Sequence, residues 1–257
     1  MTVVIKVGGR VIEDSAAFAA LLHDLAAVTV ERIVVVHGGG AAVSRVTERM
    51  GLEPRFVDGI RQTSAEEMDI VDMVLAGAVN TTLVRRARAI RPVGINGNDG
   101  GLITAARTAP ESHTGTVTAV DTAIIDALWA GGFTPIVASV AQDAAGTALN
   151  VNADHVADAI ARALRADLLC YVSDVDGVLA NQQLVPRLST AAIEAHIAAG
   201  TVHGGMAAKL RSAQSAIAAG VKQITIGSVR ATGDLADLLH HRRGTRIHFD
   251  AEKESTT

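Results

Sequence analysis

The sequence contains few of the residues that mark disulfide-rich, aromatic-rich or membrane-spanning proteins. Cys170 is its single cysteine, so no intramolecular disulfide can form. Its place in the apolar run 168–172 predicts a small core residue and not a nucleophile. Aromatic residues amount to only 2% and hydrophobic residues to 49%. The core must therefore consist mainly of Ala, Val, Ile and Leu, a composition that suits helices packed on a parallel sheet.

Charge, length and the N-terminus exclude further classes of protein. The net charge of −4 argues against a nucleic-acid-binding surface. No apolar run approaches the length of a membrane span, and a strand pattern begins at Thr2 without the anatomy of a signal peptide. We therefore expect a cytoplasmic protein that binds neither nucleic acid nor membrane. The 257 residues allow one large or two small domains. No linker is evident, which favours one continuous sheet with a functional division near residue 140.

Two strand–glycine loop–helix units occupy the first 50 residues. Strand patterns from Thr2 to Val7 and from Arg32 to Val36 end in Gly8-Gly9 and in His37-Gly38-Gly39-Gly40. Such units predict a right-handed crossover and a parallel sheet, in which ligands bind at the carboxyl ends of the strands. Glycine N–H groups and helix N-termini favour anions there. Neither loop matches a Walker or GxGxxG pattern, and a simple tight turn is an equal alternative for each. The expected helices span residues 15–28 and 41–50.

The hexapeptide 149–154, Leu-Asn-Val-Asn-Ala-Asp, is the second informative stretch. Asn152 is a good N-cap candidate for a following helix, and Asp154 lies in its first turn, where the helix dipole favours a carboxylate. Capping and turning the chain would be enough to explain both residues. Lys6 is unusual because it interrupts an apolar strand, and buried lysine requires a partner. It lies either on a sheet edge or reaches past the strand end toward an anion.

Arg61 precedes a predicted long helix. Residues Thr63 to Glu66 fit a capping box, and the helix should continue to about Arg88. The planar guanidinium of Arg61 suits a carboxylate, and a solvated surface arginine is the alternative. Residues 94–101 are too glycine-rich for a regular element, whereas residues 106–117 predict a β-excursion. Further helices are expected at 121–130, 154–164, 189–199 and after 206, further strands at 133–140, 167–172, 223–227 and 245–249, and a frayed tail from Ala251.

Metal chemistry finds little support in the sequence. Asp174 and Asp176 lack the later glutamate of an EF-hand, so we reject a calcium loop. His37 and His203 flank glycine-rich loops without a second ligand at metal spacing, which favours polar loop positions. We predict no protein-bound metal. Two lysines, Lys6 and Lys209, together with one aspartate and several glycine loops, instead suggest phosphoryl transfer, which needs positioning and charge neutralisation more than covalent chemistry.

The sequence resembles the N-acetyl-L-glutamate kinases, a branch of the amino acid kinase family. The likeness extends from Val3 to about Phe249 and rests on seven motifs in the same order at similar spacing. Each motif is weak alone, and the ordered set is strong. The motifs are residues 5–9 (IKVGG), 36–40 (VHGGG), 58–63 (DGIRQT), 72–77 (DMVLAG), 149–154 (LNVNAD), 173–178 (SDVDGV) and 204–209 (GGMAAK).

This resemblance implies an α/β fold: a single domain, residues 1–257, as an open three-layer αβα sandwich around a mainly parallel sheet. Residues from about 1 to 140 would bind N-acetylglutamate and residues from about 141 to 257 ATP. Lys6 and Lys209 would stabilise the transferring phosphoryl group, with Asp154 orienting them. The substrate would be held by Gly38, Gly39, Arg61 and Asn150, with Arg61 on its α-carboxylate. The nucleotide would be held by Gly8, Gly9, Ser173, Asp174, Val175, Asp176, Gly177, Val178, Thr201, Val202 and His203.

The implied reaction is in-line attack of the side-chain carboxylate on the γ-phosphate of ATP, the second step of arginine biosynthesis. The nucleophile is ionised at pH 7, so no general base is needed, and Mg²⁺ would be carried on the ATP phosphates. Residues 113–117 look closer to sister kinases that act on aminoadipate or glutamate carried on a small protein, which keeps that substrate class open. A non-catalytic amino-acid or nucleotide sensor is a remote alternative. Since the first strand begins at about Thr2, we expect an arginine-insensitive homodimer.

Overall fold

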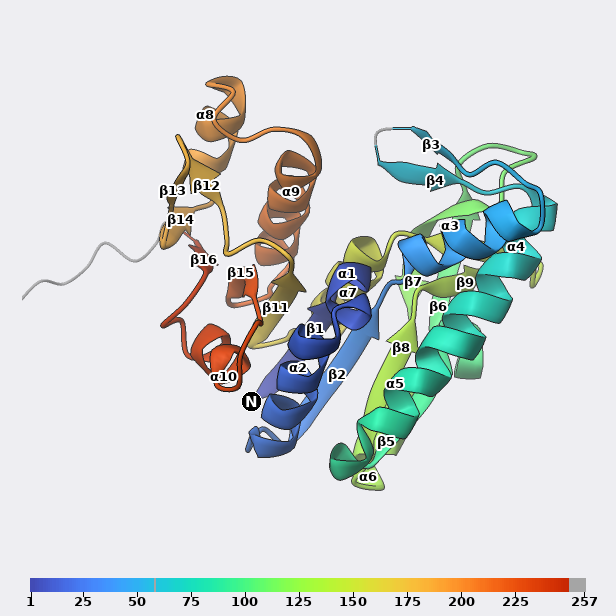
Figure 1. Ribbon diagram of the computed structural model, residues 1–257, viewed down its shortest axis with the longest axis horizontal. Helices are drawn as coiled ribbons and strands as arrows, with labels where there is room; N and C mark the ends of the chain where they lie inside the picture. The colour runs from blue at the N-terminus through green and yellow to red at the C-terminus, as the bar shows by residue number, and fades with distance from the viewer. Residues whose placement is uncertain (58, 250–257) are drawn as a thin grey trace, which may run out of the picture.

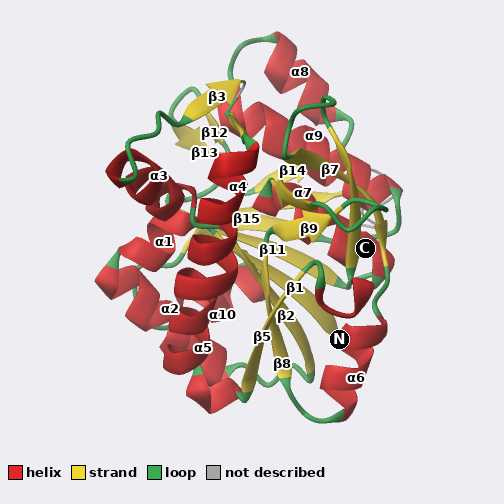
Figure 2. Ribbon diagram, turned by 90° about the vertical axis from the view of Figure 1, so that its right-hand side faces the viewer, coloured by secondary structure: helices red, strands yellow, loops and turns green. Residues whose placement is uncertain are grey.

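The protein is described by a computed structural model that covers residues 1–57 and 59–249, except the side chain of Ala208. An eight-stranded sheet with strand order β14-β16-β15-β11-β1-β2-β8-β5 forms its centre, with helices on both sides (Figures 1 and 2). All neighbours in this sheet are parallel except β15 and β16. The strands are β1 (Thr2–Val7), β2 (Arg32–His37), β5 (Pro92–Asn96), β8 (Thr134–Ala138), β11 (Leu168–Ser173), β14 (Arg187–Ser189), β15 (Ile224–Ser228) and β16 (Thr245–His248).

The two faces of the sheet bury separate apolar clusters. In β1, Val3, Ile5 and Val7 pack on one face, whereas Val4 joins the cluster on the other, as the two-residue period of a strand requires. The first face is covered by α1 (Gly9–Glu13), α2 (Ser15–Ala27), α5 (Asn80–Arg86) and α10 (Asp234–Leu239). The second is covered by α6 (Ala123–Ala130), α7 (Ala153–Ala163), α8 (Ala192–Ala198) and α9 (Gly204–Ala218). The predicted three-layer αβα sandwich with a mainly parallel sheet is confirmed.

A smaller layer caps the sheet beside the carboxyl ends of β2 and β8 (Figure 1). It consists of helices, a hairpin and a closed four-stranded barrel of order β10-β7-β6-β9. The barrel confirms the β-excursion predicted near residues 106–117. Its elements are α3 (Gly40–Arg49), β3 (Arg55–Val57), β4 (Ile60–Gln62), α4 (Ala65–Val71), η1 (Asp72–Val79), β6 (Ile103–Arg107), β7 (Thr114–Val120), β9 (Val140–Gln142) and β10 (Ala148–Val151). Short elements elsewhere are η2 (Arg88–Ile90), η3 (Asp99–Gly101), β12 (Leu179–Ala180) and β13 (Gln183–Leu184).

The predicted long helix exists, with two differences. Its middle, η1, is a π-helix between the α-helical segments α4 and α5, a form that is rare and occurs mostly at functional sites. The capping box lies one residue later than predicted. Ser64, not Thr63, is the N-cap and accepts from the N–H of Glu67, whose carboxylate accepts from the N–H of Ser64. Thr63 is buried, and its hydroxyl accepts a hydrogen bond from Asn150 instead of capping the helix.

The prediction of an irregular segment over residues 94–101 was wrong for its first three residues, which belong to β5. A side chain on Gly94 would meet the Asn80 Oδ1 atom at 2.0 Å, so glycine lets α5 lie directly on the strand. The predicted strand 133–140 is interrupted at Ser139, between β8 and β9. The first residue of the turn predicted at Asp58-Gly59 lies outside the described residues. The tail predicted from Ala251 lies entirely outside them. None of the described helices is both long and apolar enough to cross a membrane.

Candidate functional site

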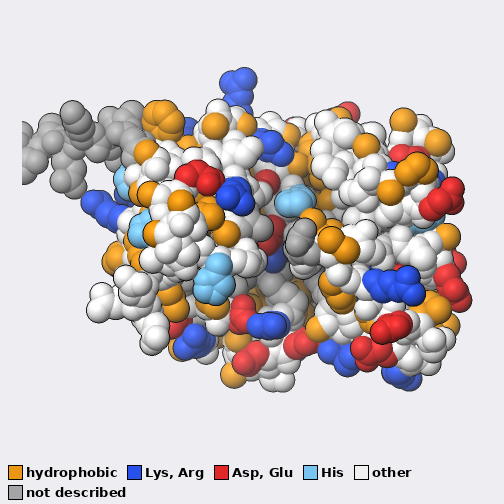
Figure 3. All heavy atoms as spheres, turned by 90° about the horizontal axis from the view of Figure 1, so that it is seen from above, with side chains coloured by type: hydrophobic (Ala, Val, Ile, Leu, Met, Phe, Trp, Pro, Cys, Tyr) orange, Lys and Arg blue, Asp and Glu red, His pale blue; other side chains and the backbone are white. Residues whose placement is uncertain are grey.

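Two adjoining pockets lie at the carboxyl ends of β1 and β2, where the glycine loops were expected to meet a ligand. The first pocket has a volume of about 220 Å³ and the second about 460 Å³. The surface is hollowed between the two halves of the molecule when viewed from above (Figure 3). Both pockets are lined by Lys6, Gly9, Gly59, Ile60 and Asn152. The first continues over the loop after β2, α3, β4 and β10, and the second over β11 and α9.

Two lysines and one aspartate meet at the junction of the pockets. Lys6 Nζ lies 2.7 Å from Asp154 Oδ1, and Lys209 Nζ lies 3.0 Å from Asp154 Oδ2. Burial works to raise the pKa of Asp154, but the two ammonium groups outweigh it and hold that pKa well below its ordinary value. Burial also lowers the pKa of Lys209, and Asp154 partly offsets this effect. The cluster therefore contains an ionised carboxylate between two cations, with an excess of positive charge available to an anion.

Secondary structure brings these three residues together. β1 is a central strand, so Lys6 is not on an edge. Its ammonium group reaches past the strand end to the carboxylate of Asp154, which agrees with the alternative that Lys6 extends toward an anion. The side chain of Asn152 caps α7 by accepting from the N–H of Asp154 at 2.8 Å, which confirms the predicted N-cap. Asp154 is thereby fixed in the first turn of α7, facing α9, which carries Lys209.

A buried histidine supports the second glycine loop. His37 is fully buried at the end of β2, so the expectation of a polar loop position was wrong. Its Nε2 lies 3.0 Å from Asn80 Nδ2, and its Nδ1 lies 2.9 Å from the Gly38 carbonyl oxygen. Burial lowers the pKa of His37 to about 4. The imidazole is therefore neutral at pH 7, accepting from Asn80 and donating to Gly38, and it fixes the loop that forms the floor of the first pocket.

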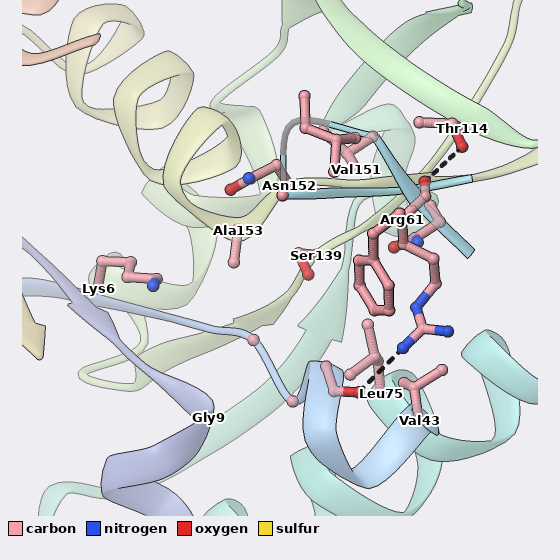
Figure 4. Close-up of a pocket in the computed structure, with 17 residues that line it drawn as sticks. Lys6, Gly9, Val43, Arg61, Leu75, Thr114, Ser139, Val151, Asn152 and Ala153 are labelled. Carbon is pink, nitrogen blue, oxygen red and sulfur yellow. Dashed lines mark hydrogen bonds between the residues drawn. The ribbon is translucent and has the colours of Figure 1, made fainter. Parts of the chain in front are cut away.

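Arg61 lies across the first pocket from Lys6 (Figure 4). It belongs to β4 and is only 7% exposed, so the alternative of a solvated surface arginine was wrong. Its guanidinium donates to Glu67 Oε1 at 3.3 Å and to Ser44 Oγ at 2.5 Å, and it lies 4.7 Å from the ring centre of Phe56. These contacts hold the charged fork at the pocket wall.

The remaining residues predicted for the amino-acid substrate also line the first pocket: Gly38, Gly39 and Asn150. Asn150 donates from Nδ2 to Thr63 Oγ1 at 2.9 Å, and Thr114 donates from its hydroxyl to the Arg61 carbonyl oxygen at 2.7 Å. These bonds connect β10, β7 and β4 around one cavity. Ser139, Val43 and Leu75 also line this pocket and were not found from the sequence, because nothing in their local pattern separates them from core residues.

The second pocket contains part of the predicted nucleotide set. Gly8, Gly9, Ser173, Asp174 and Val175 line it. The other six predicted residues do not line it. Val178 and Val202 are buried, Gly177 packs against Thr245, and Asp176 Oδ1 accepts from Ser228 and pairs with Arg230. Thr201 donates to the His196 carbonyl oxygen, and His203 is the N-cap of α9. Lining residues that sequence reasoning missed are Arg10, Val11, His155, Gly205, Met206 and Ser212.

Within residues 1–57 and 59–249, no group of three or more His, Cys, Asp or Glu side chains is arranged to hold a metal ion. The carboxylates nearest the second pocket are already paired, Asp154 with two lysines and Asp174 with Arg10 at 2.6 Å. This donor set fits a cation that arrives with a phosphate ligand better than one held by side chains.

The chain belongs to the amino acid kinase family, whose pattern it matches over residues 1–228. Two of its relatives within this family are acetylglutamate kinases. It is 40% identical over 244 residues to the acetylglutamate kinase of Halorhodospira halophila, covering 88% of this chain and 81% of that protein. It is 40% identical over 237 residues to the acetylglutamate kinase of Methanopyrus kandleri, covering 87% of this chain and 93% of that protein.

Solved structures agree on the fold. The protein smu.665 from Streptococcus mutans superposes with a TM-score of 0.80 at 28% identity, covering 96% of this chain and 98% of that chain. N-acetylglutamate synthase from Neisseria gonorrhoeae, complexed with coenzyme A and N-acetyl-glutamate, superposes with a TM-score of 0.81 at 23% identity, covering 97% of this chain and 60% of that chain. At that identity the second likeness concerns the fold alone.

Proposed function

We propose that this protein phosphorylates the side-chain carboxylate of N-acetyl-L-glutamate with ATP and so produces an acyl phosphate, the second step of arginine biosynthesis. The observation that carries the proposal is the Lys6–Asp154–Lys209 cluster at the junction of two pockets. A phosphoryl group that passes from one pocket to the other crosses this point. The names of the relatives, acetylglutamate kinase, supply the acyl group, which the cluster alone does not define.

The chemistry asks for charge neutralisation and alignment. The carboxylate nucleophile attacks the γ-phosphorus, a P–O bond forms, and the bond to the bridging oxygen breaks with ADP as leaving group. Lys6 and Lys209 neutralise the oxygens of the transferring group. Asp154 keeps the two ammonium groups apart and oriented before ATP binds. No proton has to be removed from the nucleophile, because a carboxylate with an ordinary pKa is ionised at pH 7.

We assign one substrate to each pocket. N-Acetylglutamate would occupy the first, held by Gly38, Gly39, Arg61 and Asn150, with its α-carboxylate at Arg61 and its side-chain carboxylate toward Lys6 (Figure 4). ATP would occupy the second, with Gly8 and Gly9 near its phosphates. The N-terminal lobe, about 1–140, would thus supply most of the amino-acid site, with Asn150 added from the other lobe, and the C-terminal lobe, about 141–257, would supply most of the ATP site, with Gly8 and Gly9 added. Residues 176–178 and 201–203 remain nucleotide candidates for a state in which ATP draws these loops inward.

Mg²⁺ would be carried on the ATP phosphates, where it supplies further charge neutralisation. We also propose that the protein acts in the cytoplasm as a homodimer. Met50 at the end of α3 and Met73 in η1 are 63% and 56% exposed on neighbouring elements, and a second copy would cover them. Light scattering during gel filtration should give twice the mass of the chain, and a monomer would reject the proposal.

The function is tested by ATP turnover with hydroxylamine present to trap an acyl phosphate as its hydroxamate. N-Acetylglutamate, glutamate, N-succinylglutamate and aminoadipate are compared at equal concentration, with Lys209→Ala as the inactive control. Hydroxamate from N-acetylglutamate alone is the expected result. The absence of hydroxamate from all four substrates would contradict the proposal and favour the carrier-linked kinase. The motif 113–117 that resembles those kinases lies beside the first pocket, where His113 contacts β10 and Thr114 contacts β4.

A further inference from the structure

A second buried layer lies beneath Lys209. Tyr171 occupies the middle of β11 and is directly paired with Lys6 of β1 across the parallel sheet. Paired residues in neighbouring strands leave the sheet on the same face. Tyr171 therefore points to the face covered by α7 and α9, and it is fully buried there. The Lys209 ammonium lies 4.7 Å from the centre of its ring, within the range of a cation–π contact.

The ring is held from both helices. The Tyr171 hydroxyl donates to Asp158 Oδ1 of α7, one helical turn beyond Asp154, and the ring lies against the ammonium group of Lys209, which belongs to α9. A phenol fixed at its hydroxyl and enclosed on all sides cannot change rotamer. It joins the helix that carries Asp154 to the helix that carries Lys209, directly below the ion pair between them.

We propose that Tyr171, anchored by Asp158, is a positioning residue that holds the Lys209 ammonium at the point where the phosphoryl group transfers. The inference rests on the proposed function. A lysine side chain has four rotatable bonds and loses much rotamer freedom when it is fixed. Asp154 binds one side of the ammonium and the ring face supports another, while the side chain keeps 12% of its surface open. When phosphate competes with Asp154, the ring keeps Lys209 in place.

Three variants separate positioning from packing. Tyr171→Leu removes ring and hydroxyl, Tyr171→Phe removes only the hydroxyl, and Leu169→Ala opens the same core cluster on the same face of β11 without touching Lys209. We expect kcat to fall about 10- to 100-fold in Tyr171→Leu and only about 3-fold in Tyr171→Phe, with KM for both substrates within a factor of two. Leu169→Ala should unfold at lower temperature and keep kcat. A folded Tyr171→Leu with wild-type kcat, or an equal kcat loss in Leu169→Ala, would overturn the proposal.

A second readout does not depend on turnover. Lysines are acetylated with trace acetic anhydride, and Lys209 labelling is measured by peptide mass spectrometry relative to exposed Lys222. The ratio should rise several-fold in Tyr171→Leu and stay unchanged in Leu169→Ala. If the wild-type protein forms no acyl phosphate but the ratio still rises, the proposed function fails and the positioning role stands. If the wild-type protein is active and neither kcat nor the ratio changes in Tyr171→Leu, the positioning role fails alone.

Discussion

Asp154 illustrates how a single residue sets the charge of the site. Because its pKa is held below the ordinary value, it stays ionised throughout the neutral range and leaves one net positive charge in the cluster with Lys6 and Lys209. That surplus is suited to an incoming phosphate but not to a neutral ligand. Removing either lysine would leave a neutral pair, which would stabilise the charge that develops on the transferring phosphoryl group less well.

The first prediction at this scale concerns Lys209. Its replacement by alanine should lower kcat about 100- to 1,000-fold, the usual consequence of losing one preorganised donor to a transition-state charge. KM for either substrate should change little, because most ground-state contacts lie elsewhere in the pockets. Steady-state kinetics with both substrates varied give the answer. Lys222→Ala is the matched control, since Lys222 is exposed and pairs with Asp167. An unchanged kcat in Lys209→Ala would remove this residue from the mechanism.

The second prediction at the residue scale concerns Asp158, whose surface is only 3% exposed. Burial raises its pKa to about 7, and Asp154 adds to this, while Tyr171, Arg162 and Lys209 oppose it. The folded protein then binds a proton that the unfolded chain releases near pH 4, so this group lowers stability as pH rises from about 4 to about 7. Asp158→Asn keeps the acceptor for Tyr171 and removes the charge. Wild type should therefore lose stability between pH 5 and pH 8 through this group, and the variant should not. The difference in free energy of unfolding, variant minus wild type, should increase over this range when both are measured by urea titration. A difference independent of pH would show that Asp158 titrates normally.

At the scale of elements, the loop after β2 is shaped by the π-helix packed against it. A side chain on Gly39 would meet Leu75 Cδ2 at 2.8 Å and Val79 Cγ2 at 3.3 Å, whereas nothing lies within 4 Å of one on Gly40. Gly39→Ala should therefore lower the free energy of unfolding by about 1–3 kcal/mol through overpacking. Gly40→Ala, in the first turn of α3, should leave it unchanged or raise it slightly. Thermal or urea unfolding compares the two. Equal stability of both variants would mean that η1 gives way without cost.

The elements also show how far local sequence reasoning extends. The Asn152 cap and the βαβ units were predictable because the residues that make them are close in sequence. The ordered motifs located Lys6, Asp154 and Lys209, but only the folded structure places α7 over β1 and α9 beside α7, and so sets the distances between the three side chains. Tyr171 could not be recognised within an apolar run, and Asp158 resembles any polar position of an amphipathic helix. Gly94 looked like a loop residue, because its close approach to Asn80 depends on two elements packing together.

At the scale of the whole molecule, the two pockets share a junction and otherwise draw on different loops and elements, each with contributions from both halves of the chain. The first combines the β2 loop, the β3–β4 hairpin and β10, and the second combines the β1 loop, the end of β11 and the start of α9. Gly59 and Ile60 of the hairpin line both pockets. This arrangement predicts that the binding of each substrate can be weakened separately, and that the chemical step depends on the residues at the junction and on Tyr171, which supports Lys209.

Arg61 and Arg10 test that division as a matched pair of arginines. Arg61→Gln should raise KM for N-acetylglutamate about 10- to 100-fold, the cost of a lost charged hydrogen bond, and leave KM for ATP within a factor of two. Arg10→Gln, which lines the second pocket and pairs with Asp174, should affect KM for ATP alone, and only modestly because its side chain is exposed. Initial rates with each substrate varied at saturation of the other separate the effects. If Arg61→Gln raised both KM values equally, the pockets would not be independent sites, and the assignment of one substrate to each pocket would have to be abandoned.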